Sequence, residues 1–243
     1  MKKGSFKCLV IREFYMCRKS VIPGLIAFVG FAGLVILLQL SFKVGNLALL
    51  PQEFKAEFME MFQAFCFFPV ALANVVLDGT ARSSADEGGA KWRRFRLATP
   101  IPPVRFAAAK YTIMLIQLVV SVFLVGIYVK IIDIMKVVTV DKDFVAISMM
   151  IFLVMIIYAV AMQVLSMLFG SFDKAGMILM GVAFACMVLF FPDVETGAGA
   201  DKLLYEQFVN FCRGYMYYVP LCIVAVFAVG FGATTMLYKR REK

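Results

Sequence analysis

The sequence predicts an all-α, polytopic membrane protein with six transmembrane helices, and two observations lead to this fold class. First, 63% of the 243 residues are hydrophobic and only 17% are charged, whereas soluble domains contain about 45–50% apolar and about 25% charged residues. Second, the apolar residues gather in runs of about 20, the length that crosses a bilayer as a helix. A helix suits such runs because it satisfies its own backbone hydrogen bonds in lipid.

Six apolar runs are candidate spans within one transmembrane domain, residues 21–243. The first run contains no ionisable residue and is rich in Val, Ile, Leu and Phe, each of which favours insertion by about 0.3–0.6 kcal/mol. We expect Pro69 and Pro220 to kink the second and sixth spans. The predicted spans are residues 21–42, 61–77, 111–129, 144–169, 175–191 and 215–237.

Residues 1–20 precede the first span and carry six Lys and Arg residues spread along their length. A cleaved signal peptide would confine its cations to the start, so we do not interpret this segment as one. Leu9, Phe14 and Cys17 recur at helical spacing between the cations. This pattern predicts an amphipathic interfacial helix on the cytoplasmic membrane surface. A basic, solvated flank is the alternative.

The Lys and Arg residues predict the orientation of the spans. If both termini are cytoplasmic, 18 of the 25 cations lie in cytoplasmic segments and 7 lie outside. Cytoplasmic loops of membrane proteins carry such an excess of Lys and Arg. We therefore expect a multi-pass protein of the cell membrane with both termini in the cytoplasm.

Several classes of chemistry are excluded by what the sequence lacks. It contains no histidine, so catalytic triads with a His base and imidazole metal sites cannot form within it. No phosphate-binding Gly-x-x-x-x-Gly-Lys-Ser/Thr loop occurs. We therefore expect no enzyme activity, no metal and no cofactor in this chain itself, and any energy for transport must come from another polypeptide.

The predicted spans contain polar but no deeply placed ionisable residues, which argues against transport driven by an ion gradient. The main polar side chains within them are amides, which we interpret as interhelical hydrogen-bonding groups in preference to substrate ligands. These residues are Gln39, Gln63, Asn74, Gln117 and Gln163.

The segment between spans two and three, residues 78–110, differs from the rest of the chain. It holds seven cations, the single tryptophan and three of the eight prolines. Trp92 and Phe95 lie three residues apart and project to one side of a predicted short amphipathic helix, with cations around them. Prolines 100, 102 and 103 stop this helix before the next span.

Three interpretations of this segment compete. It is a basic loop on anionic lipid, in which each cation contributes about 1 kcal/mol near the surface, or a nucleic-acid-binding patch, or a docking helix for a cytoplasmic subunit. So short a basic patch beside a membrane requires no nucleic acid, and we expect none as a partner. In the docking interpretation, Trp92 and Phe95 are apolar anchors and the cations set the orientation.

The stretch from Asp86-Glu87 through Trp92 to Thr99-Pro100-Ile101-Pro102, followed by Arg105-Phe106 and Ala109-Lys110-Tyr111, resembles the signature of ABC-2 type exporter permeases. The whole plan is also similar: a basic interfacial helix, six spans, and a longer polar segment between the last two. The resemblance is greatest to the small permeases of two-component exporters, including those for phenol-soluble modulin peptides. Pro102 stands where the family usually has a small polar residue.

The resemblance implies that two copies of this chain pair with two cytoplasmic ABC ATPase subunits, which bind ATP and Mg. Residues 87–97 would form the cytoplasmic coupling helix that the ATPases push. The ATPase-coupling residues that the resemblance carries over are Glu87, Trp92, Phe95 and Pro100. We expect Glu87 to start the helix or bind a cation of the ATPase, the two aromatic residues to anchor it, and Pro100 to transmit motion rigidly. The resemblance further predicts a short interfacial or re-entrant helix around residues 203–211, with an ordinary amphipathic surface helix as the alternative.

The function we expect is export of hydrophobic or amphipathic substrates, either peptides or lipophilic drugs, by alternating access. Spans without fixed charges suit such substrates, and their abundant Phe and Met residues adapt to varied apolar surfaces. The abundance of these residues also has a simpler interpretation, since lipid-facing positions must be apolar. Two alternatives remain open: a membrane scaffold that recruits a cytoplasmic protein without transport, and a passive channel.

Overall fold

The computed structural model describes residues 6–45, 52–73, 80–81, 84, 101–190 and 200–240. Across these residues the chain forms helices joined by turns and contains no strand, which confirms the all-helical class. In chain order the helices are α1 (Phe6–Val44), α2 (Gln52–Phe65), α3 (Phe68–Ala73), α6 (Pro103–Met135), α7 (Lys142–Phe169), α8 (Phe172–Phe190), α9 (Ala200–Tyr215), the 3₁₀ turn η3 (Met216–Tyr218) and α10 (Val219–Arg240).

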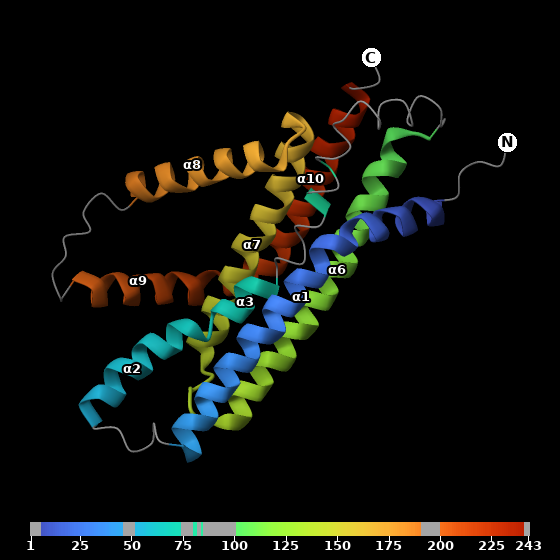
Figure 1. The fold of residues 1–243 in the computed structure, drawn as a ribbon. Coiled ribbons are helices and arrows are strands. Elements are labelled where there is room, and N and C mark those ends of the chain that lie inside the picture. Colours follow the sequence, from blue (N-terminus) through green and yellow to red (C-terminus); the bar gives the residue numbers. More distant parts are fainter. Residues whose placement is uncertain are drawn as a thin grey trace.

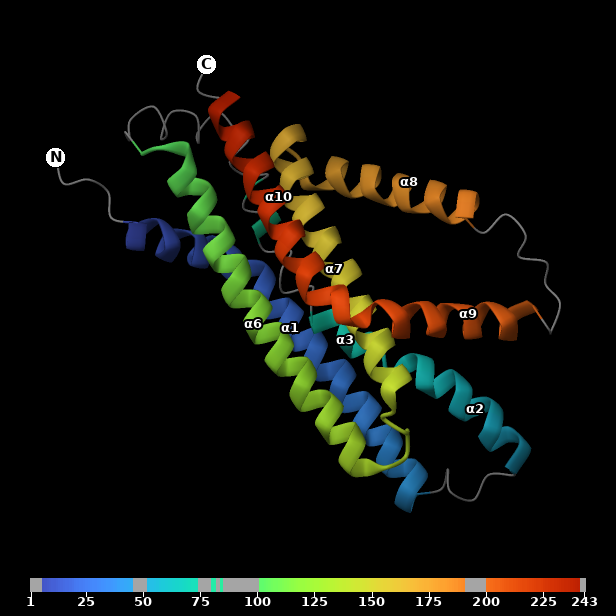
Figure 2. The same ribbon diagram turned by 180° about the vertical axis from the view of Figure 1, so that it is seen from behind.

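The long helices α1, α6, α7 and α10 form one elongated bundle (Figure 1). The start of α1 and the end of α10 lie at the same end of this bundle, which we call the termini end; the opposite end is the far end. Helix α6 runs from the termini end to the far end beside α1 (Figure 2). Helix α7 returns through the middle, packed against both α10 and α8.

Four helical stretches among the described residues are long and apolar enough to cross a membrane: Phe6–Val44, Pro103–Met135, Lys142–Phe169 and Glu206–Arg240. They contain the first, third, fourth and sixth predicted spans. Their outward faces expose large apolar side chains, as at Leu37 (63%), Phe123 (69%) and Val229 (72%). Apolar surface on this scale is unfavourable in water and suits contact with lipid. The six-span arrangement as a whole stays a prediction.

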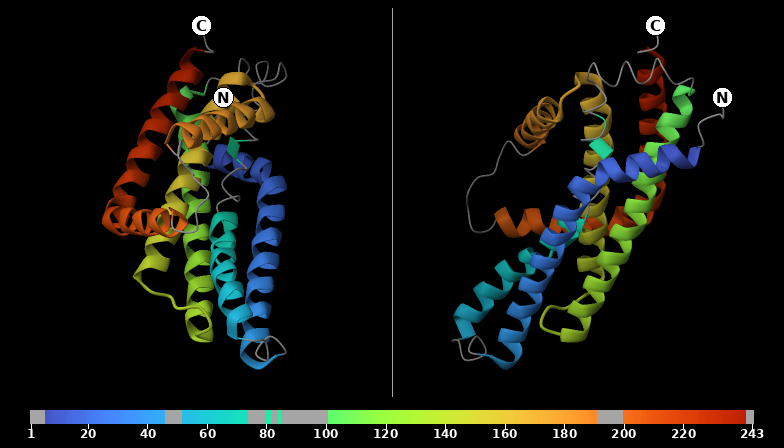
Figure 3. Two further views of the ribbon diagram at one scale, coloured as in Figure 1. Left: turned by 90° about the vertical axis from the view of Figure 1, so that its left-hand side faces the viewer. Right: turned by 45° about the vertical axis from the view of Figure 1, so that its right-hand side comes forward.

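Helix α1 joins the segment predicted as an interfacial helix to the first predicted span in a single helix of 39 residues. Its first turns lie across the bundle, and the remainder runs along α6 (Figure 3). Pro23 lies inside the helix and lacks the N–H that would bond the carbonyl four residues earlier. We attribute the change of direction to this residue, since proline kinks helix interiors.

The second predicted span, residues 61–77, is not one uninterrupted helix over the part that the structure describes. Helix α2 begins at Gln52, outside the predicted range, and a turn at Cys66–Phe67 separates it from α3. Pro69, the expected kink, is the second residue of α3, so the kink is a complete break. Two hydroxyls of α6 bond carbonyls at the two ends of α3: Tyr128 Oη donates to Cys66 O, in the break, at 2.9 Å, and Ser121 Oγ donates to Ala73 O, at the end of α3, at 2.7 Å.

Local sequence sets the ends of α6 and α7. Pro103 is the first residue of α6. Proline is favoured at this position because an N–H in the first turn has no partner within the helix, so the lack of one in proline loses no hydrogen bond. Pro102 lies extended directly before the span, and the helix that we expected Pro100, Pro102 and Pro103 to stop lies outside the described residues. Asp141 Oδ1 caps α7 by accepting from Phe144 N at 2.9 Å. Gly170 ends α7 in the left-handed conformation, at φ 64°.

Helices α8 and α9 leave the bundle on one side (Figures 1 and 2). Helix α8 corresponds to the fifth predicted span, residues 175–191, and is steeply inclined to α7. Helix α9 corresponds to the short helix expected around residues 203–211 and packs across α7 through Val209 and Cys212. Pro220 is the second residue of α10, so it opens that helix. The chain changes direction between α9 and α10 immediately before Pro220, so the expected kink of the sixth span is present as a break at the 3₁₀ turn (Figure 2).

The apolar core where α6, α7 and α10 meet contains Tyr111, Met114, Ile156 and Val160, with Phe227 packed against them. Gly230 of α10 also lies here. A Cβ at that position would overlap the Tyr111 hydroxyl and the Val160 side chain, so glycine is what allows α10 to approach the other two helices so closely.

Candidate functional site

The four residues predicted to couple to an ATPase, Glu87, Trp92, Phe95 and Pro100, all lie outside the described residues. The structure describes what flanks them on either side. Before them, Thr80, Ala81 and Ser84 are described, and after them the chain is described from Ile101 onward. The site is therefore built from the two flanks of the segment and from the helices that these flanks contact.

The first flank is held against α7. Ala81 is fully buried with Met162 and Ala175. The Ser166 hydroxyl of α7 lies 3.0 Å from the carbonyl oxygen of Ala81, and its single proton is also within reach of the carbonyl oxygens of Met162 and Gln163 in its own helix. Within the flank, Ser84 Oγ donates to the carbonyl oxygen of Thr80 at 2.8 Å. The beginning of the segment is thus buried against a long helix of the bundle.

The second flank leads without interruption into α6. Pro102 is extended, with φ −63° and ψ 142°, and its carbonyl accepts from the backbone N–H of Arg105 at 2.9 Å. Pro103 then opens α6, which continues for 33 residues. At 1.5 Å per residue this helix is about 50 Å long. A displacement of the end of the segment would therefore move the first turn of α6, which is one uninterrupted helix.

The first turns of α6 are joined to α1 by a buried ion pair. Lys110 Nζ lies 3.2 Å from Glu13 Oε2, and the two side chains are 0% and 1% exposed. The second carboxylate oxygen, Glu13 Oε1, lies 3.2 Å from Arg12 Nη2. Both oxygens of Glu13 therefore face cations, which is the arrangement that makes burial of a carboxylate tolerable.

An apolar cluster lies next to this ion pair at the termini end. Leu9 of α1, Phe106 of α6, Met167 of α7 and Tyr238 of α10 are all buried in one cluster. Four helices therefore meet in this cluster, in which Leu9 and Phe106 lie one helical turn before Glu13 and Lys110. We call these residues (Leu9, Glu13, Phe106, Lys110, Met167 and Tyr238) the junction. In a low-dielectric environment of this kind the attraction between opposite charges is strong, so separating Lys110 from Glu13 costs free energy.

Sequence reasoning found Lys110 only as part of a motif and did not find Glu13 as a functional residue. A signal was present, because Glu13 lies four residues from both Leu9 and Cys17. This spacing places a carboxylate in the apolar stripe of a helix, and all three residues are buried. Phe14, expected to share that stripe, is 57% exposed.

The interhelical hydrogen bonds that we expected of the span amides are missing at two of them, Gln39 and Gln163, while Asn74 lies outside the described residues. Gln39 and Gln163 are fully buried, yet within the described part of the chain neither carboxamide has a hydrogen-bond partner. The Oε1 atom of Gln117 is also unsatisfied there. Polar contacts between the helices come instead from hydroxyl groups, as at Ser121, Tyr128 and Ser166.

These features define the class of protein: an all-helical, membrane-embedded protein whose long apolar helices converge on a charged junction at the termini end. Comparison of the chain with protein-family models, with curated proteins and with solved structures finds no match. The resemblance to exporter permeases therefore rests on the motif around residues 86–111 and on the arrangement of the spans.

Proposed function

We propose that this chain is the membrane-spanning permease subunit of an ATP-driven exporter. The observation that carries the proposal is the ion pair between Lys110 and Glu13. It lies where the segment resembling a coupling region becomes a transmembrane helix, and it joins that helix to α1. A basic loop with no role beyond lying on lipid requires no such connection.

The described contacts support a route for mechanical work. The start of the segment is buried against α7 beside Ser166, and its end continues into α6, which is fastened to α1 through Glu13. A push on residues 87–97 would therefore act on three long helices together. Pro100, Pro102 and Pro103 restrict the backbone between the segment and α6, so little of the motion is lost in bending.

The energy is supplied by a separate cytoplasmic ABC ATPase, which binds ATP and Mg. In the assembly we propose, two copies of this chain pair with two such subunits. Trp92 and Phe95 anchor the coupling helix in a cleft of the ATPase, because buried aromatic side chains contribute most to interfaces of this kind. Glu87 starts the helix or binds a cation of the ATPase, and Pro100 transmits the motion.

The substrate class we propose is hydrophobic or amphipathic, namely peptides or lipophilic drugs. Between Tyr111 and Val129, α6 carries no charged side chain, and neither does α7 between Phe144 and Phe169. Such spans stabilise ions poorly and accept apolar surfaces. The excess of cations at the predicted cytoplasmic segments supports a cell-membrane protein with both termini inside.

The proposal is tested with inside-out membrane vesicles that contain this chain and the ATPase that co-purifies with it. We expect uptake of a fluorescent amphipathic peptide that requires ATP and stops when the ATPase carries an inactivating substitution. Uptake that is indifferent to ATP would indicate a channel. A stable complex with no uptake and no peptide-stimulated ATP hydrolysis would indicate a scaffold. Either result would contradict the proposed function.

A further inference from the structure

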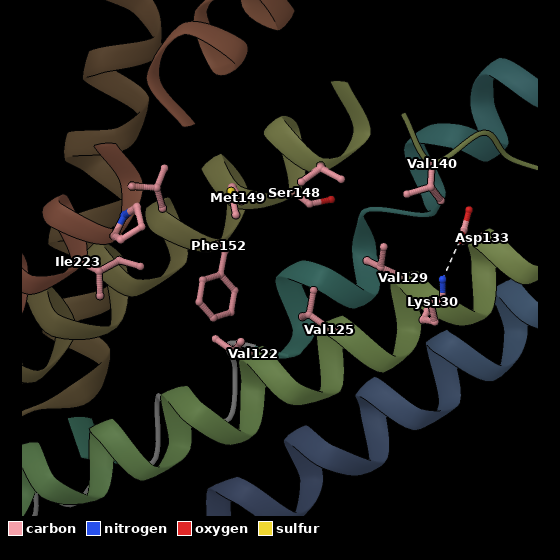
Figure 4. A pocket seen from close by; sticks show the side chains of 14 residues that line it. Val122, Val125, Val129, Lys130, Asp133, Val140, Ser148, Met149, Phe152 and Ile223 are labelled. Carbon is pink, nitrogen blue, oxygen red and sulfur yellow. Dashed lines mark hydrogen bonds and ion pairs between the residues drawn. The ribbon is translucent and has the colours of Figure 1, made fainter. Parts of the chain in front are cut away.

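A cavity of about 500 Å³ lies between α6, α7 and α10 towards the far end of the bundle (Figure 4). It is well separated from the junction, which lies at the termini end. Its volume falls within the range of about 300–1,000 Å³ that is typical of small-molecule sites. The proposed coupling to an ATPase makes no use of it.

The body of the cavity is apolar. Val122, Val125 and Val129 line one wall from the same face of α6, and Phe152 and Ile223 line the others. Gly126 also borders the cavity, and a Cβ built there would meet no atom within 4 Å. The space therefore depends in part on the absence of a side chain at Gly126.

Polar groups gather towards one end of this cavity. Ser148 is 7% exposed, and in the part of the chain that the structure describes its hydroxyl has no hydrogen-bond partner. This is unusual, because a helical Ser or Thr in an apolar environment generally bonds the carbonyl four residues back, as Thr112 does with Ala108 at 2.8 Å. A buried hydroxyl without a hydrogen-bond partner is unfavourable. A bound ligand whose oxygen accepts a hydrogen bond from Ser148 would therefore remove this cost.

The ion pair between Lys130 and Asp133 forms the polar rim, with 3.2 Å between Nζ and Oδ2. Both side chains are largely exposed, at 72% and 50%. Figure 4 shows Lys130 and Asp133 at one end of the cavity, Ser148 nearer the middle, and Phe152 and Ile223 towards the other end. From Val122 to Lys130 the helix rises about 12 Å.

We propose that this cavity binds an acyl chain of an amphiphile. The chain lies along the valines of α6, the ester or amide carbonyl next to it accepts a hydrogen bond from Ser148 Oγ, and a zwitterionic head group meets Lys130 and Asp133. The order of chemistry along the cavity, from apolar body to hydroxyl to paired charges, matches the order along such a molecule. The proposal does not depend on the proposed transport function.

The experiment uses the purified full chain in vesicles of phosphatidylethanolamine and phosphatidylglycerol. The probe is lysophosphatidylethanolamine with a photoreactive diazirine in its acyl chain, and adducts are mapped by mass spectrometry. We expect adducts concentrated on residues 122–129 and 149–152 and displaced by unlabelled lysolipid. Adducts spread evenly over all lipid-facing helices, with no displacement, would overturn the proposal.

Two variants test the cavity itself. Gly126→Leu fills it and should abolish the concentrated adducts. Gly30→Leu is the matched control, because Gly30, like Gly126, is an exposed glycine within a long helix with open space at its Cβ but does not line the cavity, and it should leave them unchanged. Equal labelling in both variants would show that the probe lies elsewhere.

The carbonyl contact has its own test, which does not rely on a bulky substitution being tolerated. Ser148→Ala should weaken competition by the ester lysolipid about fivefold. An ether analogue without the carbonyl should compete equally with wild type and with Ser148→Ala. If Ser148→Ala leaves competition by the ester lysolipid unchanged, the assigned hydrogen bond is refuted.

A diacyl probe run in parallel identifies the source of the acyl chain. Preferential labelling by the diacyl probe indicates a bilayer lipid, and preferential labelling by the lysolipid indicates a single-chain amphiphile.

Discussion

The carboxylate of Glu13 in α1 accepts a hydrogen bond from the ammonium of Lys110 in α6, with 3.2 Å between Oε2 and Nζ. The residues are 97 positions apart in the sequence, and both side chains are buried. Leu9 and Phe106, one helical turn before them, belong to a buried cluster to which every long helix of the bundle contributes a side chain. The pair therefore joins the N-terminal segment to the point at which the proposed coupling region enters the membrane domain.

Breaking this ion pair should strongly destabilise the protein. Glu13→Gln deprives Lys110 of its carboxylate in a buried site, a change that typically costs about 3–5 kcal/mol. The measurement is reversible unfolding in mixed detergent micelles. Asp133→Asn is the matched control, because it removes the exposed pair with Lys130 and should cost less than about 1 kcal/mol.

A double variant separates the ion pair from simple packing at the junction. Replacing Glu13 by Leu together with Lys110 by Met removes both charges and keeps the volume, and should recover most of the stability lost in Glu13→Gln. If Glu13→Gln unfolds at the same denaturant concentration as Asp133→Asn, the buried pair does not have the role we assign to it.

The hydroxyl of Tyr128 should stabilise the break between α2 and α3. Tyr128→Phe leaves the buried carbonyl of Cys66 without its donor, and a buried acceptor left unsatisfied costs about 1–3 kcal/mol. Tyr217→Phe, at a side chain that is 78% exposed, is the control and should be close to neutral. Thermal unfolding in detergent compares the two, and equal midpoints would contradict the assignment.

Two glycines of α10 should respond in opposite directions to the same substitution. Gly230→Ala forces a Cβ against Tyr111 and Val160, and overpacking of this kind costs about 1–3 kcal/mol. Gly232→Ala meets open space and should stabilise the helix by about 0.5–1 kcal/mol. Denaturation midpoints of the two variants test this, and a loss of stability in both would show that α10 tolerates no side chain in this region for another reason.

The proposed coupling helix should fail to hold the ATPase when its aromatic anchors are removed. Trp92→Ala combined with Phe95→Ala should release the ATPase from membranes and abolish ATP-dependent uptake, because hot-spot aromatic residues each contribute about 2 kcal/mol or more. Trp92→Phe combined with Phe95→Leu keeps the apolar surface and should retain most of the binding. Co-purification of the ATPase with the alanine variant at the wild-type level would favour the lipid-surface interpretation of residues 78–110.

The sequence by itself determined that the protein is helical and apolar enough to lie in a membrane, and it located four of the long helices. These properties are local, because an apolar run of sufficient length forms a helix in lipid regardless of its neighbours. Local chemistry also explains the ends of helices once they are seen, as with Pro103 at the start of α6 and Asp141 at the start of α7.

Only the tertiary structure decided how the helices meet. The pairing of Glu13 with Lys110, the donation from Tyr128 to Cys66 and the cavity beside Ser148 all join residues from different helices. They depend on the rotation and crossing of helices, which apolar composition leaves unspecified because many faces of a membrane helix are equally apolar. The same reason applies to Glu13. The sequence shows it as one carboxylate in an apolar stripe, but only the packing of α1 against α6 shows that it pairs with Lys110.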